Sequence, residues 1–200
     1  MPPRSSLVLF VLFYGCAPRL REIALPYPAG PVGTDAQGVV PAAASAPLQS
    51  SRLVEVDLFV DGRRLHPVAE TRDRSDRQTA LIETKEPVGL WLRRGIEYEL
   101  ARAGIESVAR EASPGAPLCL EGRVREAFAS ERFVTEARVS FHALLRCTEH
   151  GEVLLSRTYS GSAVLPEDVQ GVQGEALGRA LEQAARDLAG DVALAPACPR

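Results

Sequence analysis

The sequence has almost no lysine and no excess of positive charge. Lys85 is the only lysine among 23 basic residues, and the 200-residue chain also has 26 acidic residues and a formal net charge of −3. Nucleic-acid binding depends on a basic surface, so nucleic acid is not expected as a partner. The apolar run at residues 7–14 is much shorter than the about 20 residues that a transmembrane helix needs.

Catalytic and metal-binding motifs are missing as well. The histidines His66, His142 and His150 show no metal-ligand spacing, and Cys147 with His150 is the one pair with a ligand-like separation. A zinc site needs three or four ligands. Residues 160–162, Ser-Gly-Ser, lack the context of a hydrolase nucleophile, and no glycine-rich loop lies between a strand and a helix. The sequence therefore predicts a protein without enzymatic activity, metal or cofactor.

The N-terminal residues have the layout of a bacterial lipoprotein signal. Arg4 precedes the apolar run, and Gly15 with Cys16 supplies the small residue and the thiol at which cleavage and lipid attachment occur. Phe13 stands where the lipoprotein pattern usually has leucine. The sequence predicts a signal peptide at residues 1–15, lipidation of Cys16, and firm attachment to a membrane through the acyl chains.

Two other interpretations of this segment remain open. An ordinary secretory cut after Ala17 fits the small-residue pattern, although Pro18 would then follow the cleaved bond. A buried strand of a cytosolic protein is the third possibility.

Residues 16–51 are rich in proline, alanine and glycine, and the prolines interrupt every window in which a helical or strand period could build. We expect a disordered tether, which would hold a domain roughly 30–35 Å from its lipid. A binding motif in polyproline conformation is the alternative.

Periodic sequence covers residues 52–193 and predicts a single α+β domain, followed by a tail at 194–200. Charged residues 61–83 are expected to form a solvated loop, with an anion site built from its arginines as the alternative. Three alternating runs predict an antiparallel meander whose last turn contains His150 and Gly151. The expected elements are a strand at 53–60, a helix at 84–104, a strand at 105–110, three strands within 118–128, 137–145 and 153–159, and a helix at 168–192.

This order predicts a mainly antiparallel sheet of four to five strands with two helices packed on one face. In the first meander strand, Leu118, Leu120, Val124 and Phe128 are expected to share the buried face. In the strand at 53–60, Phe59 alternates with the buried residues and is expected on the polar side.

Lipidation of Cys16 would leave Cys119, Cys147 and Cys198, so at most one disulfide can form among them. Cys119 and Cys147 are expected on opposite faces of one hairpin, and a bridge between them would need a bulge or a strand end. Cys198 lies in the tail and could reach either partner. We favour a disulfide between Cys147 and Cys198.

The element order resembles that of the uncharacterised YajG-type lipoproteins, and auxiliary lipoproteins of envelope ABC transporters are similar in plan. The resemblance covers residues 52–192, together with Cys16 and the residues Ala-Arg-Ala-Gly-Ile that end the first helix. Residues 61–63, Asp-Gly-Arg, could correspond to the Asp-x-Arg that often follows the first strand in that group. The resemblance implies a non-catalytic periplasmic domain anchored in the outer membrane, and Ala17 after Cys16 agrees with sorting to that membrane.

Three functions are compatible with these features. The first is an accessory or structural lipoprotein that binds another envelope protein through the exposed sheet face or a strand edge. The second is an auxiliary lipoprotein of an ABC transport system that binds a small ligand or lipid between helices and sheet. The third is a hydrolase or metalloenzyme, which the missing motifs disfavour.

Overall fold

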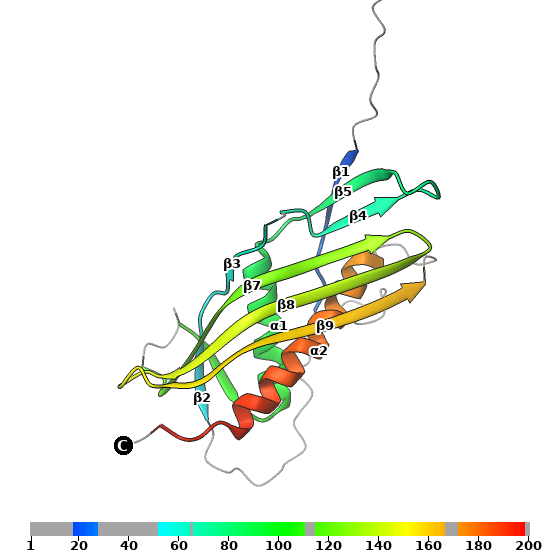
Figure 1. Cartoon of the computed structure of the whole chain (residues 1–200). Coiled ribbons are helices and arrows are strands. Elements are labelled where there is room, and N and C mark those ends of the chain that lie inside the picture. The colour runs from blue at the N-terminus through cyan, green and yellow to red at the C-terminus, as the bar shows by residue number, and fades with distance from the viewer. Residues whose placement is uncertain (1–17, 28–51, 65, 111–114, 167–171, 199–200) are drawn as a thin grey trace, which may run out of the picture.

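The computed structural model describes residues 18–27, 52–64, 66–110, 115–166 and 172–198. These ranges form one nine-stranded sheet and two helices (Figure 1). Cys16 and the predicted signal peptide lie outside them. The elements in chain order are β1 (Arg19–Ile23), β2 (Leu53–Val56), β3 (Val60–Asp61), β4 (Ala69–Arg72), β5 (Gln78–Thr84), α1 (Val88–Arg102), β6 (Glu106–Ala109), β7 (Leu118–Glu131), β8 (Val134–Cys147), β9 (Val153–Pro166) and α2 (Val172–Leu194).

The meander of β7, β8 and β9 is confirmed. Each strand has 14 residues, and both pairs are antiparallel. β8 alternates strictly between buried and more exposed residues, as expected for a strand with one face against a core. Gly151 in the β8–β9 turn has φ of +67°, a conformation that glycine adopts without a steric penalty.

The other edge of β7 carries three short parallel strands, one after another. β2 pairs with the first part of β7, β3 with the middle and β4 with the last part. The chain from residue 53 to residue 72 thus runs along β7 with two interruptions. β2 also pairs with β6, and β4 pairs with β5.

The predicted strand at 53–60 is broken because Phe59 turns into the core. Phe59 is 1% exposed, whereas Leu58 is 46% exposed, so the expected alternation reverses at this point. The Phe59 ring packs edge-on against Phe141, with ring centroids 5.6 Å apart. A Cβ at Gly122 would lie 2.3 Å from the Phe59 ring, so the glycine provides the space that the ring occupies.

The predicted fold class is wrong, and so is the predicted loop at 61–83. The sheet has nine strands and is mixed: the pairs β1·β5, β2·β6, β2·β7, β3·β7 and β4·β7 are parallel. The loop prediction missed β4 and β5 because the strands are short and lie among charged residues, so their alternation of buried and exposed positions is weak. In β5 only Ala80 and Ile82 are buried, which is too little alternation to stand out.

The two helices cover the core between them. α2 contacts β7, β8 and β9, and α1 contacts α2 as well as β3, β6 and β7. The close packing of α2 depends on Gly161 in β9, where a Cβ would lie 2.0 Å from the carbonyl oxygen of Ala180. α1 begins at Val88, directly after Pro87, and Gly104 follows it with φ of +75°. Neither helix is long and apolar enough to cross a membrane.

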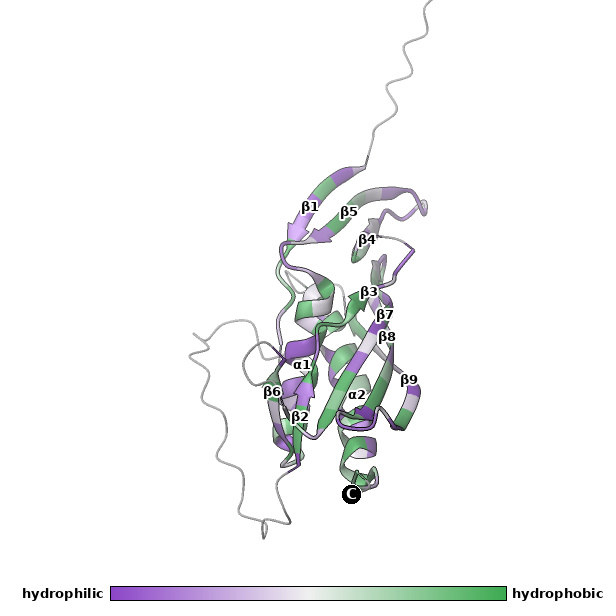
Figure 2. Cartoon of the chain, turned by 90° about the vertical axis from the view of Figure 1, so that its left-hand side faces the viewer, coloured by the Kyte–Doolittle hydropathy of each residue, from purple (hydrophilic) through white to green (hydrophobic). Residues whose placement is uncertain are grey.

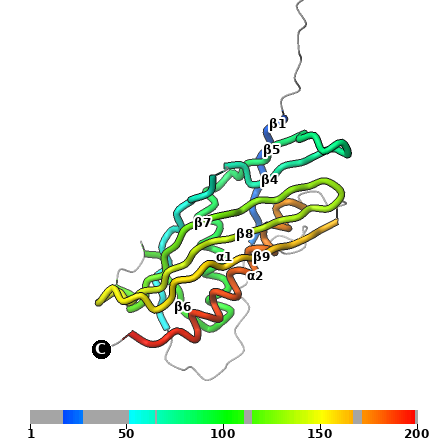
Figure 3. Tube along the Cα trace, viewed as in Figure 1, coloured from blue at the N-terminus to red at the C-terminus, as the bar shows by residue number. Residues whose placement is uncertain are grey.

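Residues 18–27 belong to the folded domain, although they were predicted to be part of a tether at 16–51. Residues 28–51 of the predicted tether lie outside the described residues. β1 lies at the sheet edge and pairs in parallel with the last five residues of β5, from Arg19 opposite Ala80 to Ile23 opposite Thr84 (Figure 2). After β1 the chain continues toward the helices (Figure 3), where Leu25 is buried. We call residues 18–27 the N-terminal arm. The sequence did not reveal the N-terminal arm for two reasons. Its flanking prolines indicated an irregular segment, and β1 is exposed on nearly every residue, so it has no buried face to detect.

Candidate functional site

The N-terminal arm is attached to both helices. Leu25 is 5% exposed in the core cluster, and the indole nitrogen of Trp91 on α1 donates a hydrogen bond to the carbonyl oxygen of Pro26 at 3.4 Å. A Cβ at Gly174 on α2 would lie 3.0 Å from the carbonyl oxygen of Ala24. The arm therefore fits between the starts of the two helices and is part of the core.

A buried carboxylate completes this attachment. Glu99 on α1 is 3% exposed and accepts a hydrogen bond of 3.0 Å from the hydroxyl of Tyr27. Arg102 donates to Glu99 at 3.1 Å, and Arg186 on α2 lies 3.8 Å from its other oxygen. Burial and the nearby carboxylate of Glu99 raise the pKa of Tyr27, which keeps the phenol protonated as a donor. Glu99 thus joins the arm, α1 and α2.

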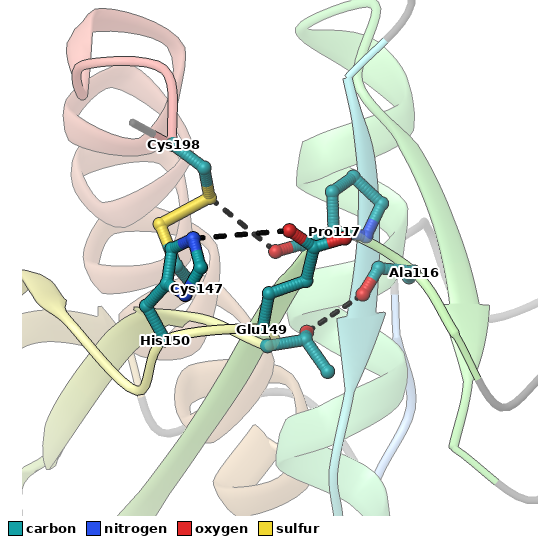
Figure 4. Close-up of a disulfide and its surroundings, with 7 residues drawn as sticks. Ala116, Pro117, Cys147, Glu149, His150 and Cys198 are labelled. Atoms are coloured by element: carbon teal, nitrogen blue, oxygen red, sulfur yellow. Dashed lines mark hydrogen bonds and ion pairs between the residues drawn. A yellow bond between two sulfur atoms is a disulfide. The ribbon is translucent and has the colours of Figure 1, made fainter. Parts of the chain in front are cut away.

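Cys147 and Cys198 form a disulfide, with their Cα atoms 5.7 Å apart (Figure 4). The bond joins the end of β8 to the chain that follows α2. The predicted tail at 194–200 is therefore partly packed, since Leu194 ends α2 and Ala195 is 7% exposed. Thr148 donates its hydroxyl hydrogen to the carbonyl oxygen of Ala116 at 2.6 Å beside this bond.

Cys119 is a buried free thiol, and burial raises its pKa. It pairs in register with Arg146, one position away from Cys147. Because Cys147 is in the disulfide, it does not form a ligand pair with His150, which lies in the exposed turn beyond β8. Within the described ranges, no three histidine, cysteine or acidic side chains are grouped as metal ligands.

A cleft of about 530 Å³ opens on the outer face of the sheet, the face turned away from the helices. We call it the arginine cleft. It lies where the segment after β3 passes the middle of β7 and β8. Its lining residues are Gly62, Arg63, Arg64, Pro67, Arg125, Glu126, Ala127, Phe128 and Ser140.

Arg63 builds one wall of the arginine cleft and is fully engaged. Its Nε and Nη2 atoms donate to the two carboxylate oxygens of Asp61 at 2.9 and 2.8 Å, and Nη1 donates to the carbonyl oxygen of Ala127 at 3.3 Å. Hydrogen bonding from Arg63 lowers the pKa of Asp61. The two-point contact with Asp61 fixes the guanidinium, and the hydrogen bond to Ala127 attaches the segment after β3 to β7. The Asp-Gly-Arg tripeptide seen in the sequence is thus a structural element of the cleft.

A bulge in β7 forms the other wall. The register of β7 against β8 shifts between Val124 and Glu126, so the buried face passes from Val124 to Ala127 and Ala129. Phe128, predicted on the buried face, instead lies half-buried on the outer face and lines the cleft. Sequence alternation alone could not locate this bulge, because an inserted residue leaves both halves of the pattern intact.

No protein-family model matches the chain, and no curated protein matches it either. Solved structures do share its fold. Protein XCC0632 from Xanthomonas campestris, assigned to the family DUF330, is 16% identical with a TM-score of 0.54, over 77% of this chain and 93% of that one. An uncharacterised protein is 13% identical with a TM-score of 0.50, over 88% and 99%. A candidate lipoprotein from Caulobacter crescentus is 22% identical with a TM-score of 0.44, over 64% and 88%.

Proposed function

We propose that the chain is a lipid-anchored, non-catalytic protein of the bacterial cell envelope that presents the arginine cleft to another envelope protein. The position of the N-terminal arm carries the proposal. Cys16, the proposed lipid attachment point, precedes the first residue of β1 by three positions. A three-residue link spans at most about 10 Å. Anchoring at Cys16 would therefore hold the domain next to the leaflet, with its outer sheet face accessible from the side.

The chemistry of the arginine cleft fits an acidic protein segment. The charge of Arg63 is matched by Asp61, whereas the exposed side chains of Arg64 and Arg125 form no ion pair within the part of the chain that the structure describes. Glu126 is the one acidic residue of the lining. Phe128 adds an aromatic surface to the same lining. Arginine and aromatic side chains are enriched among the residues that dominate the energy of protein interfaces.

The proposed location is the periplasmic side of the outer membrane. Ala17, the residue after Cys16, supports it, because in the envelope lipoproteins that the chain resembles this residue agrees with sorting to the outer membrane. Replacing Cys16 with serine tests the anchor. The Cys16→Ser chain is expected to leave the membrane fraction, while wild type stays in it. A Cys16→Ser protein that has lost residues 1–15 and still remains with the membranes in the absence of detergent contradicts lipid anchoring.

A photo-crosslinking amino acid at position 128 tests the role of the cleft. We expect it to capture a discrete envelope protein in intact cells, and we expect the double substitution Arg64→Ala with Arg125→Ala to abolish the cross-link. The same probe at Leu194, which is 86% exposed at the end of α2, is the control and should capture nothing in common with position 128. Equal capture from both positions contradicts the cleft as the binding site.

The carrier role is the alternative, because a cleft of about 530 Å³ has the size of a small-molecule site. Native mass spectrometry of protein purified from membranes distinguishes the two. A bound small molecule or lipid that is lost in the Arg64→Ala, Arg125→Ala variant would support the carrier. Genes for a transport permease and ATPase beside this gene would favour the auxiliary role in an ABC system.

A further inference from the structure

The strand ends nearest to Cys16 lie in one row across the sheet. Following the registers from pair to pair, Arg19 lies opposite Ala80, Ala80 opposite Thr71, and Thr71 opposite Glu131. The row continues from Glu131 to Thr135 and from there to Leu165. Six strands therefore begin or end near this row, which is about 24 Å wide at the usual strand spacing. Figure 1 shows the β4–β5 and β7–β8 turns and the end of β9 on the same side of the molecule.

Exposed apolar side chains gather at this row. Four of the eight large apolar residues that are exposed in the described ranges lie within two positions of it: Leu20 at 64%, Phe133 at 57%, Val134 at 40% and Val164 at 63%. Phe133 is at the tip of the β7–β8 turn, beyond the last pair of the ladder. Phe133, Val134 and Val164 are grouped at the β8 and β9 ends of the row, and Leu20 lies at its other end. Soluble proteins expose single apolar residues without consequence, but such a group indicates a surface that contacts something.

Arginines lie in the two turns at this end of the sheet. Arg74 and Arg77 are exposed in the β4–β5 turn, and Arg132 places its guanidinium 5.2 Å from the centre of the Phe133 ring. Two exposed acids of the same turn, Asp73 and Asp76, partly offset them, and Asp76 lies 3.7 Å from Arg132. Long basic side chains beside an aromatic ring are suited to the boundary of a phospholipid leaflet, where the ring enters the acyl region and the charges reach the phosphates.

We propose that this end of the sheet is a membrane-contact surface, which lies on the headgroups of the phospholipid leaflet that holds the Cys16 lipid and inserts Phe133 at its boundary. The inference depends on the proposed lipid anchor. The short link from Cys16 to β1, with only two residues between Cys16 and Arg19, favours a leaflet as the surface that this row contacts. A leaflet within about 10 Å of Arg19 is the nearest surface available to the row. The domain would then stand on the membrane with its long meander directed away from it.

Tryptophan fluorescence tests the contact in the mature, lipidated protein reconstituted into phospholipid vesicles whose acyl chains carry bromine as a quencher. The single native tryptophan, Trp91, is 1% exposed in the core and supplies a constant background. Phe133→Trp is the probe. Val153→Trp is the matched control, because Val153 is 51% exposed at the opposite end of β9, about 40 Å away along the strand.

We expect the emission added by Phe133→Trp to be quenched several-fold more strongly than the emission added by Val153→Trp. Equal quenching of the two variants, in protein that carries its lipid and floats with the vesicles, overturns the contact surface and leaves the anchor intact. A mass measurement that finds no lipid on Cys16 removes the anchor itself, so the two failures are distinguishable.

Discussion

Replacing Leu25 with alanine should destabilise the whole domain, because the N-terminal arm is part of its core. Leu25 is 5% exposed and packs in the same cluster as Trp91 and Leu177. Truncation of a buried leucine to alanine costs about 2–5 kcal/mol, and the lower values apply where neighbours can move into the space. The arm lies at an edge of the sheet and can shift, so we expect a loss of about 2–3 kcal/mol.

Leu20→Ala is the matched control for this prediction. Leu20 is in the same arm but is 64% exposed, and an exposed substitution is expected to change stability by less than about 0.5 kcal/mol. Urea unfolding of the purified proteins, followed by circular dichroism, measures both free energies. If Leu25→Ala is no more destabilising than Leu20→Ala, the arm is not packed in the core, and the argument that Cys16 lies close to the folded domain fails.

Three further predictions concern packing, pH and the disulfide. Gly161→Ala should lower the free energy of unfolding by about 1–3 kcal/mol, because the added Cβ has no space. Gly190 is an exposed position of α2 with open space, so Gly190→Ala should raise the free energy of unfolding by about 0.5–1 kcal/mol. Urea unfolding of both variants measures these changes. Folding raises the pKa of Tyr27, so its contribution to the free energy of unfolding is fully present below the phenol's unfolded pKa of about 10 and declines as the pH rises above it. Tyr27→Phe should weaken this decline, which unfolding curves recorded between neutral and alkaline pH measure. Peptide mapping without reduction should find Cys147 linked to Cys198, and finding both as alkylated thiols would refute the bond.

The meander could be predicted from the sequence because its long strands each have one buried face. In β8, every second residue from Thr135 to Cys147 is buried, and this period of two is a strong signal. The closing helix was predictable for the same reason, since Leu177, Leu181 and Leu188 recur at helical spacing and are all buried.

The missed elements are those whose pairing partner is distant in sequence. β1 is exposed on four of its five residues and is held by its backbone pairing with β5, so its residues show no alternation between buried and exposed positions. The turn of Phe59 into the core depends on the space above Gly122, more than 60 positions away. The arginine cleft depends on the β7 bulge in the same way. Tertiary contacts, rather than local propensity, determine all three.

The N-terminal peptide of protein recovered from cells tests the central claim most directly. Trypsin cuts after Arg4 and Arg19, so the mature lipoprotein should release residues 16–19, beginning at Cys16 and carrying acyl chains on its thioether-linked glycerol and on its amino group. Mass spectrometry of the denatured, digested membrane fraction should detect this lipopeptide. An unmodified peptide of residues 5–19, obtained from protein dissolved in the cytosol, would contradict lipid anchoring at Cys16.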